Sequence, residues 1–448
     1  MSGRETSEIG VVDQRPIDLG LLPATASLSS SGRLSVGGCD MESLANEMGT
    51  PLFVYDEEHL RARCREYRSL FGAHVTYAGK AFLCAAMVRL VDEEGLHLDV
   101  STGGELHVAL ANKFPADRLV FHGNNKSTEE LSTALEVGVG RVIVDSFDEM
   151  DRIEQLVGGG LPAPSVLVRV TPGVEAHTHS YIETGTEDSK FGFSVAGGAA
   201  LEACARAAHS DAMHLAGLHC HIGSQIFVLQ SYARAARVVM GLAAEVEKIA
   251  GAAIDEINLG GGLGVRYHRD DEAPSLEAYA SLLKESFSSA AADAGLRGTP
   301  VLSVEPGRSI AAQAGLTLYR VGTIKEIRGV RTYVAVDGGM SDNVRPATYG
   351  ARYETFVPAR AGAERTLIAT VAGKHCEQGD VLVHDATLPA DLHVGDVLCT
   401  PTTGAYGYSM ASNYNKVPRP AVVFVREGAH RVAVRRETYD DLLALDEV

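Results

Sequence analysis

Cysteine is scarce in this sequence, and the cysteines present are not grouped. Seven cysteines are spread over 448 residues, and no two of them have the C-x-x-C spacing. Small domains held by disulfides and zinc ribbons both need grouped cysteines, so the pattern argues against both classes. Scattered thiols suit a reducing compartment, and we expect the protein to be cytoplasmic.

Basic residues are fewer than acidic ones. The sequence has 40 lysines and arginines against 58 aspartates and glutamates, which gives a formal net charge of −18. A surface of this charge repels phosphate backbones and anionic lipid headgroups. The sequence also has no run of roughly 18 uncharged apolar residues and no signal-peptide pattern at its start. We therefore predict a soluble protein that binds neither nucleic acid nor membranes.

Patterns that bind metal ions are missing as well. Neither an H-x-x-x-H nor a D-x-D cluster supplies a good metal site in this sequence. Such spacings place several ligands close together, which a metal centre needs. We therefore expect no metal cofactor.

From residue 75 onward the sequence alternates short β-branched runs with longer segments of helical period. The predicted strands are 75–78, 97–100, 118–122, 141–145, 166–170, 215–220, 256–260 and 301–305. Segments between them, such as 83–95, 129–138 and 234–250, carry apolar residues every three or four positions, as amphipathic helices do. The first four strands begin 22, 21 and 23 residues apart, which is the length of one strand-helix unit. The repeat predicts an α/β fold, a (β/α)8 TIM-like barrel over residues 48–310.

The pattern changes after Arg308. Short alternating strands, separated by turn residues and without a long helical repeat, predict a mostly antiparallel β-rich C-terminal domain over residues 311–448. Residues 1–47 contain short strand-like pieces, and they either join this domain or cap the barrel. The long polar segment 171–194, which follows the fifth strand, is expected to be a loop that borders the active site.

Polar residues follow the ends of several predicted barrel strands. They are Lys80, Asp99, His122, His219, His221, Gly260, Gly261, Gly262, Glu305 and Arg308. Each alone has an ordinary structural explanation, because a single lysine is usually a solvated surface charge and a single histidine a hydrogen-bonded core residue. In barrels of this kind the reacting groups lie at the carboxyl ends of the strands. The joint placement of these residues therefore favours an active site.

The chemistry of these groups indicates a phosphorylated cofactor. A glycine triplet directly after a strand lets backbone N–H groups approach a phosphate, although the same pattern is also found in plain turns. A lysine can carry an aldehyde as a Schiff base, a glutamate can keep a pyridine nitrogen protonated, and a histidine can lie flat against a ring. Together these groups predict a pyridoxal phosphate site. Lys190 competes with Lys80 as the Schiff-base lysine, but it lies in the long loop and not at a strand end.

Several motifs, in their order along the chain, resemble a known family. They are YAGKAF, LDVSTGGEL, HGNNKS, GVEAHTH, KFGFS, HCHIGSQIF, NLGGGLG, EPGR, VDGGMSDNVRPATYGARY, GKHCEQGD and TGAYGYSM. The sequence resembles the barrel-fold pyridoxal-phosphate decarboxylases of ornithine, diaminopimelate and arginine, and it is most similar to the diaminopimelate branch. The resemblance implies pyridoxal 5′-phosphate as cofactor and decarboxylation of meso-2,6-diaminopimelate to L-lysine and CO2, the last step of lysine biosynthesis.

The resemblance also implies a role for individual residues. Lys80 would be the Schiff-base lysine, His221 would stack on the cofactor ring, and Glu305 would face the pyridine nitrogen. The residues implied to cradle the phosphate are Ser224, Gly262, Gly307 and Arg308.

A second set of implied residues concerns the substrate. The residues implied to hold its carboxylates are Arg308, Arg345 and Tyr349, and Tyr406 would touch both cofactor and substrate. Cys376 would donate a proton and Glu377 would bind the distal amino group. In this family the segment with these two residues reaches the active site from the partner subunit, so the resemblance implies a homodimer with shared active sites.

Four positions depart from the residues that the family leads us to expect, and none of them removes a named group. They are Gly79, Thr348, Gly407 and Asn413.

Three alternatives stay open. The first is a decarboxylase of another amino acid, of the ornithine, arginine or carboxynorspermidine type. The second is a non-catalytic pyridoxal phosphate carrier, which would normally lack the second domain and its HCE segment. The third is an aldolase that uses Lys80 directly, which leaves Glu305 and the glycine triplet unexplained. A substrate with a second carboxylate and a second amine explains Arg345 and Glu377 better than a simple basic amino acid does.

Overall fold

The computed structural model describes residues 16–174, 189–251 and 253–447. The chain divides into two compact units. Unit 1 comprises the described residues up to Leu60, the segment Arg266–Asp271 and the chain from Ala311 onward, and unit 2 comprises Arg61–Val265 and Glu272–Ile310. None of the helices in the described ranges combines the length and the apolar character needed to cross a bilayer.

Unit 2 is the predicted parallel barrel. Its strands are β5 (Thr76–Ala78), β6 (His97–Val100), β7 (Leu119–Phe121), β8 (Arg141–Val144), β9 (Ser165–Thr171), β11 (His214–His219), β12 (Glu256–Asn258) and β13 (Val301–Ser303). Each pairs in parallel with the next, and all eight predicted strands are confirmed. The first and last strands meet through a parallel bridge between Val75 and Val304, where the Thr76 N–H donates to the Val304 carbonyl at 2.9 Å.

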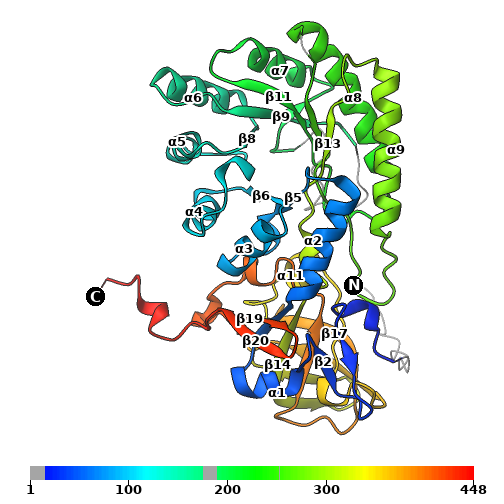
Figure 1. Cartoon of the computed structure of the whole chain (residues 1–448). Helices are drawn as coiled ribbons and strands as arrows, with labels where there is room; N and C mark the ends of the chain where they lie inside the picture. Colours follow the sequence, from blue (N-terminus) through cyan, green and yellow to red (C-terminus); the bar gives the residue numbers. More distant parts are fainter. Residues whose placement is uncertain (1–15, 175–188, 252, 448) are drawn as a thin grey trace, which may run out of the picture. The chain divides into compact units, whose positions relative to one another are not determined.

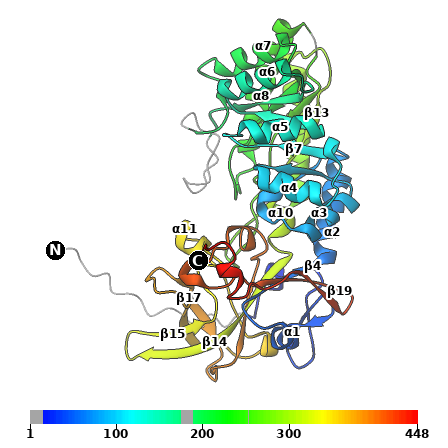
Figure 2. The same ribbon diagram turned by 90° about the vertical axis from the view of Figure 1, so that its left-hand side faces the viewer.

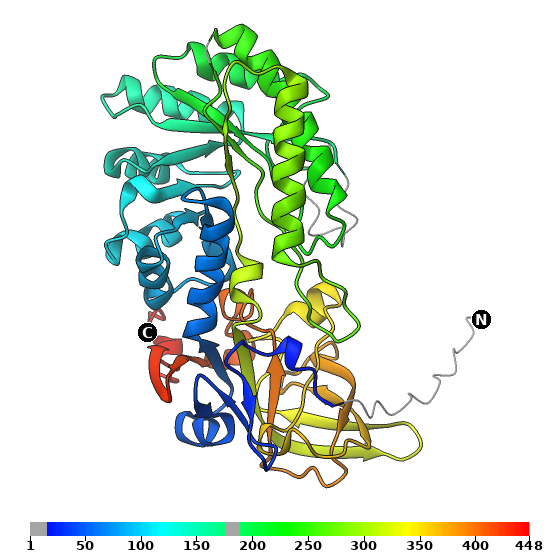
Figure 3. The ribbon, with the colours of Figure 1, turned by 45° about the vertical axis from the view of Figure 1, so that its right-hand side comes forward.

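Helices alternate with these strands and lie outside them (Figure 1). They are α3 (Ala85–Glu93), α4 (Gly103–Ala111), α5 (Thr128–Val137), α6 (Phe147–Gly158), α7 (Ala199–His209), α8 (Gln230–Ala250) and α9 (Leu276–Ala294). Figure 3 shows α8 and α9 side by side. Local sequence explains where α5 begins and ends, because Ser127 and Glu130 form a capping box and Gly138 adopts the left-handed conformation after its last turn. The alternation brings the carboxyl ends of all the strands to one end of the barrel.

Unit 1 is a mostly antiparallel sheet, as predicted. Its strands are β4 (Leu52–Asp56), β14 (Gly315–Ile327), β15 (Arg331–Val336), β16 (Leu367–Ala372), β17 (Val381–Leu388), β18 (Val397–Pro401), β19 (Ala421–Arg426) and β20 (Ala429–Val434). Their order is β17-β16-β15-β14-β4-β19-β20, and β18 pairs with β14. The pairs β15–β16 and β4–β19 are parallel. Figure 2 shows β14 and β15 as a long hairpin.

The described part of the N-terminal segment belongs to unit 1. It contributes β1 (Ser27–Leu28), β2 (Leu34–Val36), β3 (Cys39–Asp40) and α1 (Met41–Met48). Leu34 and Met41 are buried in one hydrophobic cluster with Leu316 of β14 and Val423 of β19. This segment therefore packs on the β-rich sheet, which the sequence left undecided.

A buried ion pair fastens the barrel near the end of β7. The Lys126 ammonium donates to the carbonyls of Gly123 and Ile143 at 2.8 and 2.7 Å and to Glu149 Oε1 at 2.7 Å. Both charged side chains are almost fully buried. Glu149 Oε2 also accepts the Asp145 N–H at 3.0 Å. The pair thus ties the loop after β7 to the end of β8 and to α6.

We predict that Lys126→Met destabilises the protein strongly. The substitution leaves the Glu149 carboxylate buried without its cation, a change that typically lowers the free energy of unfolding by about 3–5 kcal/mol. Urea unfolding followed by circular dichroism measures the loss. Lys248→Met, at an exposed position of α8, is the control and should change stability by no more than about 0.5 kcal/mol. Equal stabilities for the two variants would contradict the prediction.

Candidate active site

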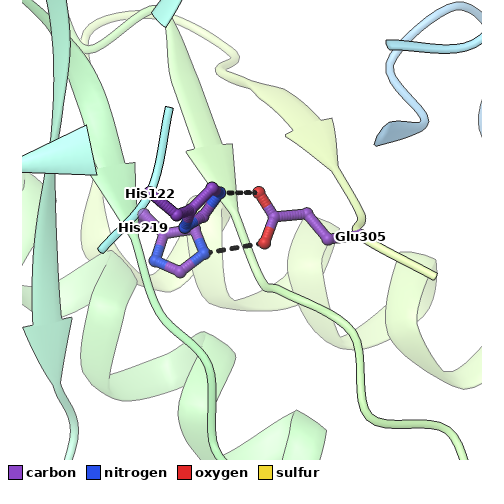
Figure 4. Close-up of side chains that lie close together, drawn as sticks. All are labelled: His122, His219 and Glu305. Carbon is purple, nitrogen blue, oxygen red and sulfur yellow. Dashed lines mark hydrogen bonds and ion pairs between the residues drawn. The ribbon is translucent and has the colours of Figure 1, made fainter. Parts of the chain in front are cut away.

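Glu305 follows β13 and is buried among three hydrogen-bond donors, and Figure 4 shows two of them, His122 and His219. Its Oε1 accepts from His122 Nε2 at 3.0 Å and from Asn258 Nδ2 at 2.8 Å, and its Oε2 accepts from His219 Nε2 at 3.0 Å. These donors lie at the ends of β7, β12 and β11. Burial by itself would raise the pKa of Glu305, but the two imidazoles lower this pKa well below its usual range. The barrel therefore holds a carboxylate anion at its strand ends.

The same cluster has the spacing of a metal site. The ligand atoms of His122, His219 and Glu305 all lie within 4.8 Å of one another, close enough to share an ion. However, each imidazole nitrogen is already at hydrogen-bond distance from its own carboxylate oxygen, and Asn258 adds an amide donor. We therefore interpret the cluster as a carboxylate held by N–H donors.

Lys80 and His221 follow β5 and β11, at the same end of the barrel as this carboxylate. Lys80 is exposed in the short 3-10 helix Gly79–Ala81, directly after β5. Burial, together with the charge of Lys80, lowers the pKa of His221 well below its usual range, so its ring is neutral. Its Nδ1 accepts the Gly261 N–H at 3.2 Å. Gly260 has a φ of +69°, and a Cβ there would lie 2.8 Å from His221 Nδ1, so only glycine leaves room for this ring.

The residues predicted to cradle a phosphate lie together. Arg308 donates to Ser224 Oγ from Nη2 at 2.8 Å and from Nε at 3.3 Å. The Ile226 N–H donates to the Gly262 carbonyl at 2.9 Å, which places the segment after β11 beside the glycine triplet. Gly307 packs closely, since a Cβ there would lie 2.9 Å from Ala78 Cβ.

The glycine triplet 260–262 is not simply three backbone N–H groups that are available to bind a phosphate. The Gly260 N–H donates to Asn258 Oδ1 at 2.8 Å and the Gly261 N–H donates to His221 Nδ1. A Cβ on Gly261 would lie 2.1 Å from the Glu305 carbonyl oxygen. The first two glycines therefore serve packing and internal hydrogen bonds, and Gly262 is left as the candidate phosphate contact.

Three of the four unexpected residues have local explanations. A Cβ on Gly79 would lie 2.7 Å from the Asp99 carbonyl oxygen, and one on Gly407 would lie 2.7 Å from the Thr403 carbonyl oxygen. Asn413 Nδ2 donates to Glu437 at 2.6 Å. Nothing in the structure explains Thr348.

Apart from Arg308, which belongs to unit 2, the predicted substrate residues belong to unit 1. Arg345 and Tyr349 are the first and last residues of the short helix α11 (Arg345–Tyr349), and positions four apart lie on one face of a helix. Arg345 is buried, donates to the Tyr353 hydroxyl at 2.5 Å and lies 4.2 Å from the centre of the Tyr267 ring. Tyr267 comes from the segment Arg266–Asp271, which follows β12 in the chain. The guanidinium is thus fixed by two tyrosines that sequence reasoning missed.

Cys376 is held on the surface of unit 1. Its N–H donates to Asn415 Oδ1 at 3.1 Å, and the preceding His375 N–H donates to the buried Asp380 at 2.8 Å. Cys376 and Glu377 are both exposed. These bonds fix the backbone of the HCE segment and leave its cysteine and glutamate side chains accessible.

The other cysteines are unsuited to proton transfer. Among the seven, all of which are described, Cys376 is exposed and the remaining six are buried. Burial raises the pKa of Cys64, Cys204 and Cys220 to about 12. Exposure singles out Cys376 as the candidate proton donor.

Tyr406 lies in a strained turn after β18. Its φ is +64°, in the left-handed region that bulky side chains seldom adopt. Such outliers concentrate at functional sites, where the surrounding structure holds them. The turn therefore agrees with a ligand contact for this tyrosine.

Part of the predicted loop lies outside the described residues. Positions 175–188 of the segment 171–194 fall there, including most of the GVEAHTH motif. The described end forms β10 (Phe193–Ser194), which pairs with β9. Lys190 is exposed just before β10, so it lies in the loop and not at a barrel strand end. That Lys190 is a weaker candidate than Lys80 for the Schiff-base lysine stays a prediction.

Comparisons with known proteins agree with this geometry. Residues 57–312 match the family model described as "Pyridoxal-dependent decarboxylase, pyridoxal binding domain". Diaminopimelate decarboxylase of Mycobacterium tuberculosis is 47% identical over 434 residues, which cover 95% of this chain and 97% of that protein. Diaminopimelate decarboxylase of Bacillus subtilis is 47% identical, with coverage of 95% and 98%. The chain belongs to the diaminopimelate decarboxylase family.

A solved member of the diaminopimelate decarboxylase family also shares the fold. The crystal structure of the enzyme from M. jannaschii in complex with L-lysine has a TM-score of 0.87 and 35% sequence identity. The similarity covers 95% of this chain and 98% of that one. The (β/α)8 barrel and the antiparallel sheet are therefore the fold of the family.

The loop that precedes α11 generates a prediction of pH dependence. Asp342 is buried, its Oδ1 accepts from the Tyr319 hydroxyl at 2.5 Å, and burial raises its pKa to about 7. Because an unfolded aspartate titrates near about 3.9, the folded chain binds more protons between about pH 4 and 7. Stability should therefore fall as the pH rises through this window and then level off.

Asp342→Asn should remove this part of the pH dependence. The wild type should lose up to about 4 kcal/mol more than the variant between pH 4 and 8, from a shift of roughly three pKa units. Urea unfolding of both proteins at several pH values measures the difference. Parallel stability curves for the two proteins would refute the assignment.

Proposed function

We propose that this protein decarboxylates meso-2,6-diaminopimelate to L-lysine and CO2 with pyridoxal 5′-phosphate as cofactor, the last step of lysine biosynthesis. The observation that carries the proposal is that an anionic Glu305 and Lys80 both follow strands at the carboxyl end of a barrel that matches the pyridoxal-binding family. Identity of 47% to diaminopimelate decarboxylases over nearly the whole chain supports the substrate.

The residues of unit 2 fit the cofactor. Lys80 would bind its aldehyde covalently, the neutral His221 ring would lie against the cofactor ring, and Glu305 would face the ring nitrogen. The residues proposed to hold the phosphate are Ser224, Gly262, Gly307 and Arg308. When bound, pyridoxal phosphate supplies a sink for the electron pair that the departing carboxylate leaves behind.

The residues of unit 1 fit a substrate with two charged ends. Arg345 presents a fixed guanidinium, which binds a carboxylate in two-point geometry, with Tyr349 on the same helix face. Arg308, which belongs to unit 2, is a further carboxylate ligand, and Tyr406 of unit 1 contacts the bound molecule. Glu377 accepts the distal ammonium, which is the handle for specificity. Cys376 delivers a proton from Sγ to the carbon that has lost its carboxylate.

We further propose that the enzyme is a cytoplasmic homodimer in which Cys376 and Glu377 act at the cofactor of the partner subunit. Their exposure supports this arrangement, because side chains that serve a neighbouring subunit have to be accessible on their own.

Product analysis tests the reaction. The purified protein, reconstituted with pyridoxal phosphate, is given meso-diaminopimelate, ornithine or arginine in separate reactions, and the amines and amino acids formed are separated. L-lysine from meso-diaminopimelate, without appreciable product from the others, is expected. Turnover of ornithine or arginine in preference to meso-diaminopimelate would overturn the assignment.

Lys80→Ala should abolish the covalent link to the cofactor, because Lys80 combines an amine with a strand-end position at the barrel mouth. Borohydride reduction followed by peptide mapping locates the labelled lysine. The matched control is Lys190→Ala, which should still carry the label on Lys80. A label found on Lys190 in the wild type would disprove the assignment.

Mixed dimers test the shared site. Lys80→Ala and Cys376→Ala homodimers should each be inactive, but a mixed dimer has one site with both lesions and one with neither. With random exchange at equal amounts, half of the dimers are mixed, so about a quarter of wild-type activity should return. Different affinity tags verify that subunits have exchanged. Exchange without recovered activity would show that Cys376 acts within its own chain.

A further inference from the structure

Three buried residues around Glu305 have no role in the proposed reaction. His122, His219 and Asn258 do not carry the cofactor, cradle the phosphate or hold the substrate in the proposal above, yet all three are almost fully buried. Each donates a hydrogen bond to the same carboxylate, and they come from three different strand ends; Figure 4 shows the two histidine bonds. A buried polar cluster of this kind is a candidate for tuning the group that it surrounds.

The surrounding bonds fix which atoms donate. The Gly260 N–H donates to Asn258 Oδ1 at 2.8 Å, so the amide NH2 of Asn258 must face Glu305. Burial lowers the pKa of His219, which leaves a neutral ring with one proton. That proton lies on Nε2, because Nε2 faces Glu305 at 3.0 Å and the carboxylate is an acceptor.

The two ring nitrogens of His219 have different surroundings. Its Nδ1 is buried and has no hydrogen-bond partner among the described residues. A buried acceptor without a partner is unfavourable, so the site is not arranged to satisfy the imidazole itself. The His122 ring meets it edge-on, with ring centres 5.0 Å apart and planes at 73°. The two rings are therefore placed so that each donates a hydrogen bond to the Glu305 carboxylate.

The number of donors leaves one place for the cofactor. A carboxylate offers about four acceptor positions. Three are taken by N–H groups of the protein, so one is left for the N–H of a protonated pyridine ring. Each donor stabilises the negative charge and makes the carboxylate a weaker base.

We propose that His122, His219 and Asn258 are positioning residues that keep Glu305 a weak base, so that the proton between the carboxylate and the cofactor stays on the ring nitrogen. Removal of a donor makes the carboxylate more basic and draws this proton toward oxygen. A ring without its proton is a poorer electron sink. The inference rests on the proposed cofactor and not on the identity of the substrate.

The test uses pyridoxal phosphate labelled with 15N in its ring and bound to the full-length protein without substrate. The 15N resonance distinguishes a protonated from an unprotonated ring nitrogen. The wild type should show the protonated resonance, and His122→Leu and His219→Leu should both move toward the unprotonated one. We also expect kcat to fall about 10- to 100-fold in these variants with little change in KM, the range for one lost hydrogen bond to a charged group.

Matched variants separate positioning from general damage. His219→Gln keeps an N–H near the position of Nε2 and should restore a resonance close to that of the wild type. His214→Leu, at the exposed start of the same strand, should have no effect. If His219→Leu fails to fold, His219→Asn replaces it, because its shorter amide does not reach Glu305.

The outcomes distinguish this inference from the proposed reaction. A displaced resonance in the donor-lacking variants and a restored one in His219→Gln support the inference even if meso-diaminopimelate is not the substrate. A wild-type resonance in folded, cofactor-bound His122→Leu and in the donor-lacking His219 variant overturns it, even if L-lysine is formed. An unprotonated ring nitrogen in the wild type also overturns it.

Discussion

A buried carboxylate is the constraint on which the barrel mouth depends. Glu305 is buried, and an ionised buried carboxyl group is stable only where hydrogen-bond donors replace its hydration. The parallel barrel meets this demand, because it brings the ends of β7, β11 and β12 to the side of the strand that precedes Glu305. The close glycines are part of the same solution, since a side chain on Gly261 would occupy the space of the Glu305 backbone.

Periodicity explains why the barrel strands could be predicted while parts of the second sheet could not. Barrel strands recur at nearly constant intervals and pair with their neighbours in sequence, so one local pattern identifies them. β4 and β18 lack that regularity. β4 runs directly into the helix α2 (Glu57–Phe71), and its partners β14 and β19 lie hundreds of residues further along the chain. Only the pairing of β4 with β14 and β19 shows that it is a central strand of this sheet.

The residues of the candidate site likewise fall into those that the sequence predicts and those that it does not. The rule that reacting groups lie at strand ends was enough to select Lys80, His219 and Glu305 from the sequence, because barrel topology brings such positions together. It could not indicate which donors face Glu305. The sequence pattern places Asn258 only inside the strand 256–260, although its position just before the glycine triplet is a usable signal. The tyrosines around Arg345 come from separate segments and have no shared motif.

The position of β4 in its sheet sets the order in which the protein is completed on the ribosome. β4 ends at Asp56, but its parallel neighbour β19 begins at Ala421, so the entire barrel is synthesised between two strands that pair. Barrel strands find partners among their immediate successors. All five residues of β4 are buried in the finished protein. Until β19 is synthesised, the edge of this apolar strand that β19 covers has no partner strand. The edge of β4 that β19 covers therefore needs protection during synthesis until β19 has emerged.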